Sequence, residues 1–302
     1  MAKIPLEKTI GATYSFAFSN ILSVFGVLWL PSLILAAMVG ALIYFVVPDF
    51  RFVDHAFVAQ ERFDQLMEGA FLIARFAGLI ALVSLVVRAM VTVGVMEKAL
   101  GRREGPVFVY FSLGPPVWRL IGAIVLAVLI IAAVTALTVI AAGLSVWAAA
   151  HYAPGILGLV KVVAVCSAVL WVVYMALRLT FFLPAVVVAE ERIGLGRAWE
   201  LGGGNFWRII GLMFAVLLPI GIVARILGFA LFGGVWLHGI RDAIQAHHGI
   251  SPHEIAGIVV QNIGPMWPAA LAFAAVYLTL VTGLAIGAIG TAYKAVTAES
   301  AV

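Results

Sequence analysis

The sequence predicts an all-α protein, a polytopic membrane helical bundle with about six transmembrane helices and short interfacial helices. Apolar residues make up 65% of the chain and charged residues only 11%, whereas a soluble domain carries about 25% charged residues. The apolar residues also form six runs, each long enough to cross about 30 Å of hydrocarbon as a helix. We therefore expect residues 1–302 to form a single integral membrane domain.

The six spans are predicted by the positions of the uncharged runs. Helices are expected because lipid offers no partner to backbone polar groups, and the strict alternation of a barrel strand is absent. Pro31 and Pro184 should kink or end helices. The single cysteine, Cys166, excludes an intrachain disulfide. The spans are placed at about 21–47, 70–95, 120–148, 156–183, 209–232 and 267–291.

The distribution of lysine and arginine predicts the orientation. Ten of them fall in connections on one side and three on the other, so both termini should be cytoplasmic. No basic cluster is interleaved with aromatic residues, which argues against nucleic-acid binding. The ten are Lys3, Lys8, Lys98, Arg102, Arg103, Arg119, Arg192, Arg197, Arg208 and Lys294, and the three are Arg51, Arg62 and Arg241.

The two outer loops, 48–69 and 233–266, are each predicted to contain a helix. Asp54 is a candidate cap in the first, and Ser251-Pro252-His253-Glu254 is a capping box in the second. These helices either lie flat at the interface or cap the bundle. All six histidines fall on this side, as ordinary loop residues or as a cluster that senses pH or zinc. No complete metal or cofactor site is predicted.

A repeated pattern marks the cytoplasmic ends of the spans. Trp118-Arg119-Leu120-Ile121-Gly122 matches Trp207-Arg208-Ile209-Ile210-Gly211 at an offset of 89 residues. The same offset aligns Tyr110 with Trp199 and Gly114 with Gly203. A fainter copy contains Tyr14, Asn20 and Gly26. The pattern predicts a unit of one short interfacial helix, a turn and two spans, used three times.

The residues that could carry function are basic and aromatic. Every ionisable residue within or at the edge of a span is basic: Arg75, Arg88, Lys161, Arg178 and Arg225. Such arginines either extend to the membrane surface or form a basic pocket for phospholipid headgroups. Tryptophan favours headgroup depth. The predicted lipid-headgroup residues are Arg88, Arg119, Arg178, Arg208, Trp118 and Trp207.

The last span carries a stripe of small residues, Gly283, Gly287 and Thr291. Small residues at this spacing allow two helices to approach closely in lipid. The stripe is expected to pack inside the bundle or to form a homo-oligomer contact.

The stretch from Arg178 to Pro184, followed by Glu190-Glu191, Ala198-Trp199 and Gly204-Asn205-Phe206-Trp207-Arg208, supports a family resemblance. It resembles the multi-span membrane domain attached to some bacterial glycerophosphodiester phosphodiesterases and found as stand-alone inner-membrane proteins. The resemblance implies a helical membrane module with no assigned activity. The phosphodiesterase chemistry of the fused members belongs to a separate soluble barrel, for which this chain has no room.

Three functional classes remain, in decreasing order of support. The first is a non-enzymatic inner-membrane protein that binds or organises anionic lipids, or assists a membrane-protein partner. The second is a transporter for an anionic or lipidic solute, which internal repeats and intramembrane basic residues would suit. A membrane enzyme is least favoured, because the sequence contains no convergent set of acid and base residues.

Overall fold

The computed structural model describes residues 3–46, 63–245 and 266–299, and these contain helices but no strands. The elements follow in the order α1 (Leu6–Ser19), α2 (Ile21–Val46), α4 (Phe63–Ala99), α5 (Pro115–Tyr152), the 3-10 turn η2 (Pro154–Ile156), α6 (Leu157–Thr180), α7 (Leu183–Glu190), α8 (Leu195–Gly202), α9 (Phe206–Gln245) and α11 (Trp267–Glu299).

Six helices are long and apolar enough to cross a membrane: α2, α4, α5, α6, α9 and α11. The predicted all-α class and the six predicted spans are confirmed. The chain breaks at 181–182 between α6 and α7, and Pro184 lies in the first turn of α7, as expected. Pro31 lies inside α2, which does not end there. The 40 residues of α9 measure about 60 Å, so this helix is longer than the hydrocarbon is thick.

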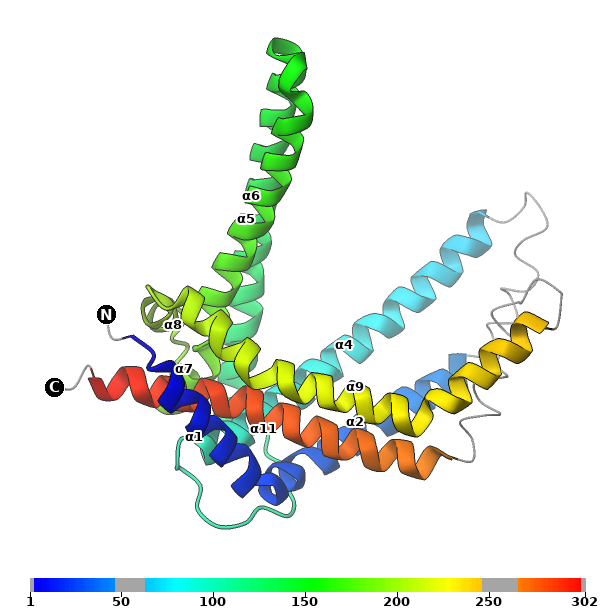
Figure 1. The fold of residues 1–302 in the computed structure, drawn as a ribbon, viewed down its shortest axis with the longest axis vertical. Helices are drawn as coiled ribbons and strands as arrows, with labels where there is room; N and C mark the ends of the chain where they lie inside the picture. Colours follow the sequence, from blue (N-terminus) through cyan, green and yellow to red (C-terminus); the bar gives the residue numbers. More distant parts are fainter. Residues whose placement is uncertain (1–2, 47–62, 246–265, 300–302) are drawn as a thin grey trace.

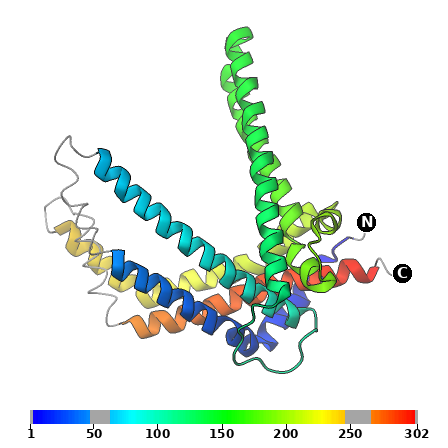
Figure 2. The ribbon, with the colours of Figure 1, turned by 180° about the vertical axis from the view of Figure 1, so that it is seen from behind.

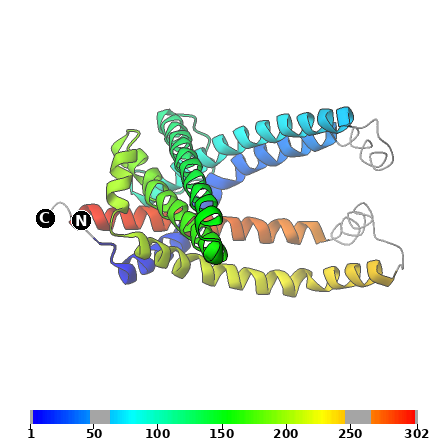
Figure 3. The same cartoon turned by 90° about the horizontal axis from the view of Figure 1, so that it is seen from above.

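The long helices form three antiparallel pairs that diverge from a common base (Figure 1). The pairs are α2 with α4, α5 with α6, and α9 with α11. Figure 2 shows the α5–α6 pair separate from the others, and Figure 3 shows the other two pairs as two limbs. Both chain ends lie at the base, where α1, α7 and α8 also lie.

The buried core lies at this base, which we call the hub (residues 4–28, 87–127, 179–216 and 284–296). All buried apolar side chains of the described residues except Pro31 and Ala149 fall within it. The short helix α7 is its centre, because Ala185, Val186 and Val187 are fully buried and α7 contacts α4, α5 and α11. The limbs instead expose apolar side chains such as Leu159 and Trp171, which only a lipid environment accommodates over so large an area.

Three glycines mark close contacts around the hub. A Cβ atom on Gly26 would lie 1.8 Å from the carbonyl oxygen of Val107, so the two backbones touch there. Cβ atoms on Gly122 and Gly211 would lie 3.6 Å from Ile193 and 4.0 Å from Leu6, respectively. Each contact joins the first helix of one pair to the segment that precedes the next pair, and the third returns to the N-terminal segment. The α1 helix accordingly packs on α9 and α11 more than on α2.

The segments that precede the three pairs differ in structure. Helices α1 and α8 precede α2 and α9, but residues 102–114 before α5 contain no helix. The interfacial helix expected in this middle copy is therefore a wrong prediction. Gly101 and Gly105 adopt positive φ angles of 77° and 79°, and Pro106 follows directly, so the chain cannot continue a right-handed helix there.

Asn20 and Asn205 close α1 and α8 in the same way. The Nδ2 atom of each donates a hydrogen bond to the carbonyl four residues earlier, Phe16 at 3.0 Å and Leu201 at 3.2 Å. The carbonyl of each accepts from the amide four residues later, in the first turn of the next helix. Asn20 and Asn205, which the sequence aligns, therefore make equivalent hydrogen bonds at the end of one helix and the start of the next.

The expectations for the outer loops lie mostly outside the described residues. These include Asp54, the capping box at 251–254, and His55, His247, His248 and His253; the side chain of His238 is likewise not described. His151, near the end of α5, lies against Trp147 with ring centroids 4.7 Å apart. Within the described part of the chain, no three potential metal ligands come together.

Candidate lipid-binding rim

Trp118 and Trp207 lie in the first turns of α5 and α9, with 56% and 77% of their surface exposed. Local sequence places them there. Gly114 is the N-cap of α5 and is followed by two prolines. Proline suits the first turn of a helix, because the amide hydrogen that it lacks would have no partner within the helix there. Before α9, Gly204 adopts a φ of 73°, which favours glycine, and so turns the chain out of α8.

The arginines beside these tryptophans have different surroundings. Arg119 is half-buried and makes no hydrogen bond or ion pair with any described residue. Arg208 donates a hydrogen bond from Nη1 to the carbonyl oxygen of Ile4, 2.7 Å away. The amide of Ile4 in turn donates to Oδ1 of Asn205 at 3.0 Å. Arg208 therefore helps to hold the N-terminal segment, whereas the Arg119 guanidinium is available to a ligand.

Arg88 and Arg178, the two arginines predicted inside spans, also differ. Arg88 is exposed on α4 and contacts no acceptor among the described residues. The Arg178 guanidinium lies over the ring of Trp199, 3.9 Å from its centroid. Its Nε atom donates to the Trp199 carbonyl at 3.2 Å, and its Nη1 atom donates to the Tyr174 hydroxyl at 2.7 Å. The two arginines lie on different helix pairs.

An apolar pocket of about 310 Å³ lies between α5, α6 and α8. Ile131 and Val134 line it from α5, Met175 and Leu179 from α6, and Gly196 from α8. Trp199 also lines it, so one indole contributes both to the pocket wall and to the platform under Arg178.

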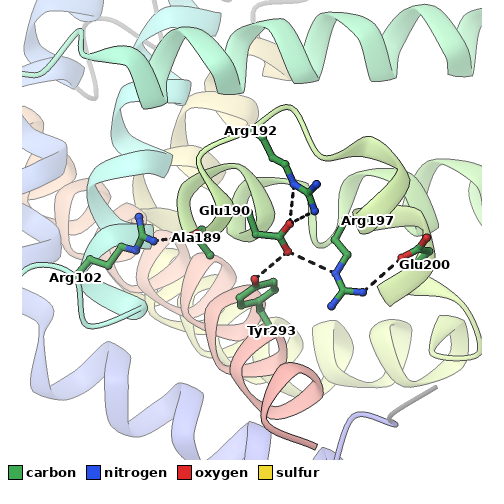
Figure 4. Close-up of polar contacts among 7 residues, drawn as sticks. All are labelled: Arg102, Ala189, Glu190, Arg192, Arg197, Glu200 and Tyr293. Atoms are coloured by element: carbon green, nitrogen blue, oxygen red, sulfur yellow. Dashed lines mark hydrogen bonds and ion pairs between the residues drawn. The ribbon is translucent and has the colours of Figure 1, made fainter. Parts of the chain in front are cut away.

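A polar cluster in the hub was not found from the sequence (Figure 4). The Glu190 carboxylate accepts from Nε of Arg192 at 2.9 Å and from the Tyr293 hydroxyl at 3.3 Å, and it pairs with Arg197 at 3.5 Å. Tyr293 lies 103 residues from Glu190 in the chain. No local pattern could have shown this contact, although the pair Glu190-Glu191 was visible.

Arg102, in the segment between α4 and α5, bonds to the end of α7. It donates to the carbonyls of Val188 at 2.7 Å and Ala189 at 2.6 Å, and it pairs with Glu191 at 3.2 Å. These carbonyls belong to the last turn of α7, where helical partners are missing. Arg102 therefore completes this helix end, a role that the positive-charge count, which placed it in a connection on the cytoplasmic side, did not indicate.

Tyr110 packs against α4 from the connection that follows this helix. Its ring lies against Gly94, where an added Cβ would come within 2.8 Å of it, and the Arg103 guanidinium lies 4.8 Å from the ring centroid. Burial raises the pKa of the Tyr110 hydroxyl above its ordinary value, and the negative charge of Glu97 raises it further. The hydroxyl therefore remains neutral at physiological pH.

The small-residue stripe of α11 faces α1 of the same chain. A Cβ on Gly283 would make an ordinary contact with Ala17 at 3.6 Å, and one on Gly287 would lie only 2.7 Å from the Phe16 ring. The hydroxyls of Thr291 and Thr13 are 2.9 Å apart. This face is thus occupied within the monomer.

The predicted lipid-headgroup residues around the hub form what we call the rim: Arg88, Arg119, Arg178, Arg208, Trp118 and Trp207. Lys161 and Arg225 are exposed on α6 and α9, and the side chain of Arg75 is not described. The structure therefore places the rim residues around the hub, with the four rim arginines on four different helices, α4, α5, α6 and α9. No known family model, curated protein or solved structure is similar enough to match this chain.

Proposed function

We propose that this chain is a non-enzymatic integral protein of the bacterial inner membrane whose rim binds anionic lipid. One observation carries the proposal. At the start of α5, the exposed Trp118 indole stands beside Arg119, a guanidinium with no acceptor in the described part of the protein. An interfacial indole and an available cation are the two groups that hold a phospholipid headgroup.

The charge distribution supports an orientation with both termini in the cytoplasm. The ten lysines and arginines assigned to the inner side all lie in the hub or next to it, and both chain ends lie at this base (Figure 1). Basic residues near an anionic leaflet contribute about 1 kcal/mol each to its attraction. The rim would therefore face the inner leaflet.

We also infer that the three helix pairs are internal repeats, arranged as a closed ring. The aligned glycines Gly26, Gly122 and Gly211 each contact the segment that precedes the next pair, and Asn20 and Asn205 end α1 and α8 with equivalent bonds. A module of this kind, without its own chemistry, agrees with what the resemblance to the phosphodiesterase-associated membrane domain implies.

Transport is a weaker proposal. It would need a water-filled cavity lined by Arg88, Arg178 or Arg225, whereas the described pocket beside α8 is apolar and is lined by none of them.

Native mass spectrometry of the purified protein tests the proposal. We expect retained phosphatidylglycerol or cardiolipin, reduced about tenfold in an Arg88→Ala/Arg119→Ala double variant if about 1.4 kcal/mol of binding is lost. Arg225→Ala is the matched control, because this exposed arginine lies about 25 Å further along α9 than Arg208. An equal lipid load in all three proteins contradicts the proposal.

A further inference from the structure

We propose that the pocket between α5, α6 and α8 holds an acyl chain of one phospholipid, whose phosphate is bound by Arg178. This assignment rests on the proposed lipid binding and names a specific site for it. The pocket volume, about 310 Å³, lies at the lower end of the roughly 300–1,000 Å³ typical of ligand sites. Its walls are apolar side chains, which suits a hydrocarbon chain and not a soluble anion.

Arg178 provides the headgroup site. An arginine carries five N–H donors, and Arg178 uses two of them, toward Trp199 and Tyr174. The other three have no acceptor among the described residues, and no described carboxylate forms an ion pair with Arg178. A half-buried cation without an anion is costly in a membrane. A lipid phosphate would supply both the missing charge and the missing acceptors.

Trp199 connects the two halves of the proposed site. Its indole lines the pocket and also lies under the Arg178 guanidinium at 3.9 Å. The cation–π contact fixes the plane of the guanidinium. A phosphate on Arg178 and a chain in the pocket would thus be about one indole width apart, a separation that a glycerol backbone spans.

At the other two helix pairs, aromatic side chains pack against glycines. Beside α4, the ring of Tyr110 packs against Gly94. Against α11, Phe16 and Ala17 of α1 pack on Gly287 and Gly283. In both cases protein side chains fill the contact, whereas the described pocket lies at the α5–α6 pair.

Gly196→Phe is the variant that tests the pocket. Gly196 lines it, and a Cβ added there meets no atom within 4 Å, so the new ring can enter the pocket without displacing the backbone. Gly143→Phe is the matched control: Gly143 is also an exposed helical glycine with open space around it, and it lies in α5 outside the pocket lining.

The probe is phosphatidylglycerol with a diazirine on one acyl chain, diluted into phosphatidylglycerol vesicles that contain the full-length protein. After irradiation, peptide mass spectrometry measures the label on the segment that includes Met175 and Leu179. We expect Gly196→Phe to reduce this label about tenfold, which corresponds to about 1.4 kcal/mol, and Gly143→Phe to leave it unchanged. Arg178→Gln should also reduce it, whereas Arg225→Gln should not.

The outcomes separate this inference from the proposed function. If label at Met175 is insensitive to both Gly196→Phe and Arg178→Gln, the pocket assignment is wrong, even when the Arg88/Arg119 pair still controls lipid retention in native mass spectra. If the wild-type protein retains no anionic lipid, the proposed function itself is wrong. If only Gly196→Phe acts, the chain site exists without its phosphate partner, and the proposal is overturned as stated.

Discussion

Arg88 and Arg178 show how one residue type at similar sequence positions takes different roles. Arg178 stacks on Trp199 because α8 folds back on α6, and three of its donors meet no acceptor among the described residues. Arg88 has no aromatic residue described over it and stays exposed on α4. The difference arises from the segment that precedes the next helix pair, which forms helix α8 in one case and contains no helix over residues 102–114 in the other.

At Gly287 the structure requires the absence of a side chain. We predict that Gly287→Leu destabilises the protein by about 1–3 kcal/mol, because its Cβ would lie 2.7 Å from the Phe16 ring and force α1 away from α11. Thermal unfolding in detergent measures the change. Gly143→Leu, in open space on α5, should leave the melting temperature nearly unchanged. Equal melting temperatures for both variants would contradict this packing.

At the scale of elements, the short helix α7 shows how the hub is stabilised. This helix begins directly after the break at 181–182, with Pro184 in its first turn, and its apolar residues are buried on all sides. Because eight residues are too few for a helix to be stable alone, α7 depends on its neighbours. Arg102 completes its last turn, and Glu190 ties it to α8 and α11 through Arg197 and Tyr293.

The junction between α8 and α9 also holds the N-terminal segment. We predict that Asn205→Ala loosens residues 4–9, because the Ile4 amide loses its acceptor at 3.0 Å and an unmade buried hydrogen bond costs about 1–3 kcal/mol. Hydrogen–deuterium exchange should become faster in that segment. Asn20→Ala removes the equivalent helix-end bond without this tether, so it should not have the same effect on residues 4–9. Unchanged exchange in Asn205→Ala would exclude the tether.

At the scale of the whole molecule, the three helix pairs diverge from one hub, so stability and lipid exposure are separated in space. The hub contains almost all of the buried apolar side chains of the described residues, while the limbs expose theirs. The closed arrangement of segments around the hub makes its folding depend on both ends of the chain, since α1 packs on α11.

This arrangement predicts which sites a membrane-impermeant maleimide can reach. With Cys166 replaced by serine, Tyr152→Cys at the α5–α6 turn should be labelled in intact spheroplasts, because this residue is 82% exposed at the end away from the hub. Lys3→Cys and Ala298→Cys should be labelled only after lysis. Labelling of both termini before lysis would reverse the orientation and place the rim on the outer leaflet.

The sequence by itself determined the all-α class and the six spans, including α9 and α11. The length of an apolar run is a local property, and it decides whether a helix can cross the hydrocarbon. The sequence also placed Trp118 and Trp207 next to the ends of spans, and in the structure both are exposed in the first turns of α5 and α9. The prediction failed for residues 102–114, where no helix forms and where Gly105, like Gly101 just before the segment, has a positive φ angle.

Only the tertiary structure decided which arginines are available. Arg102 and Arg208 are bound to backbone carbonyls 86 and 204 residues away, whereas Arg119 is not. The Trp199 platform and the pocket beside it likewise depend on α8 folding onto α5 and α6. Contacts between distant segments depend on how the helices pack against one another, and helical periodicity within one segment contains no information about that packing.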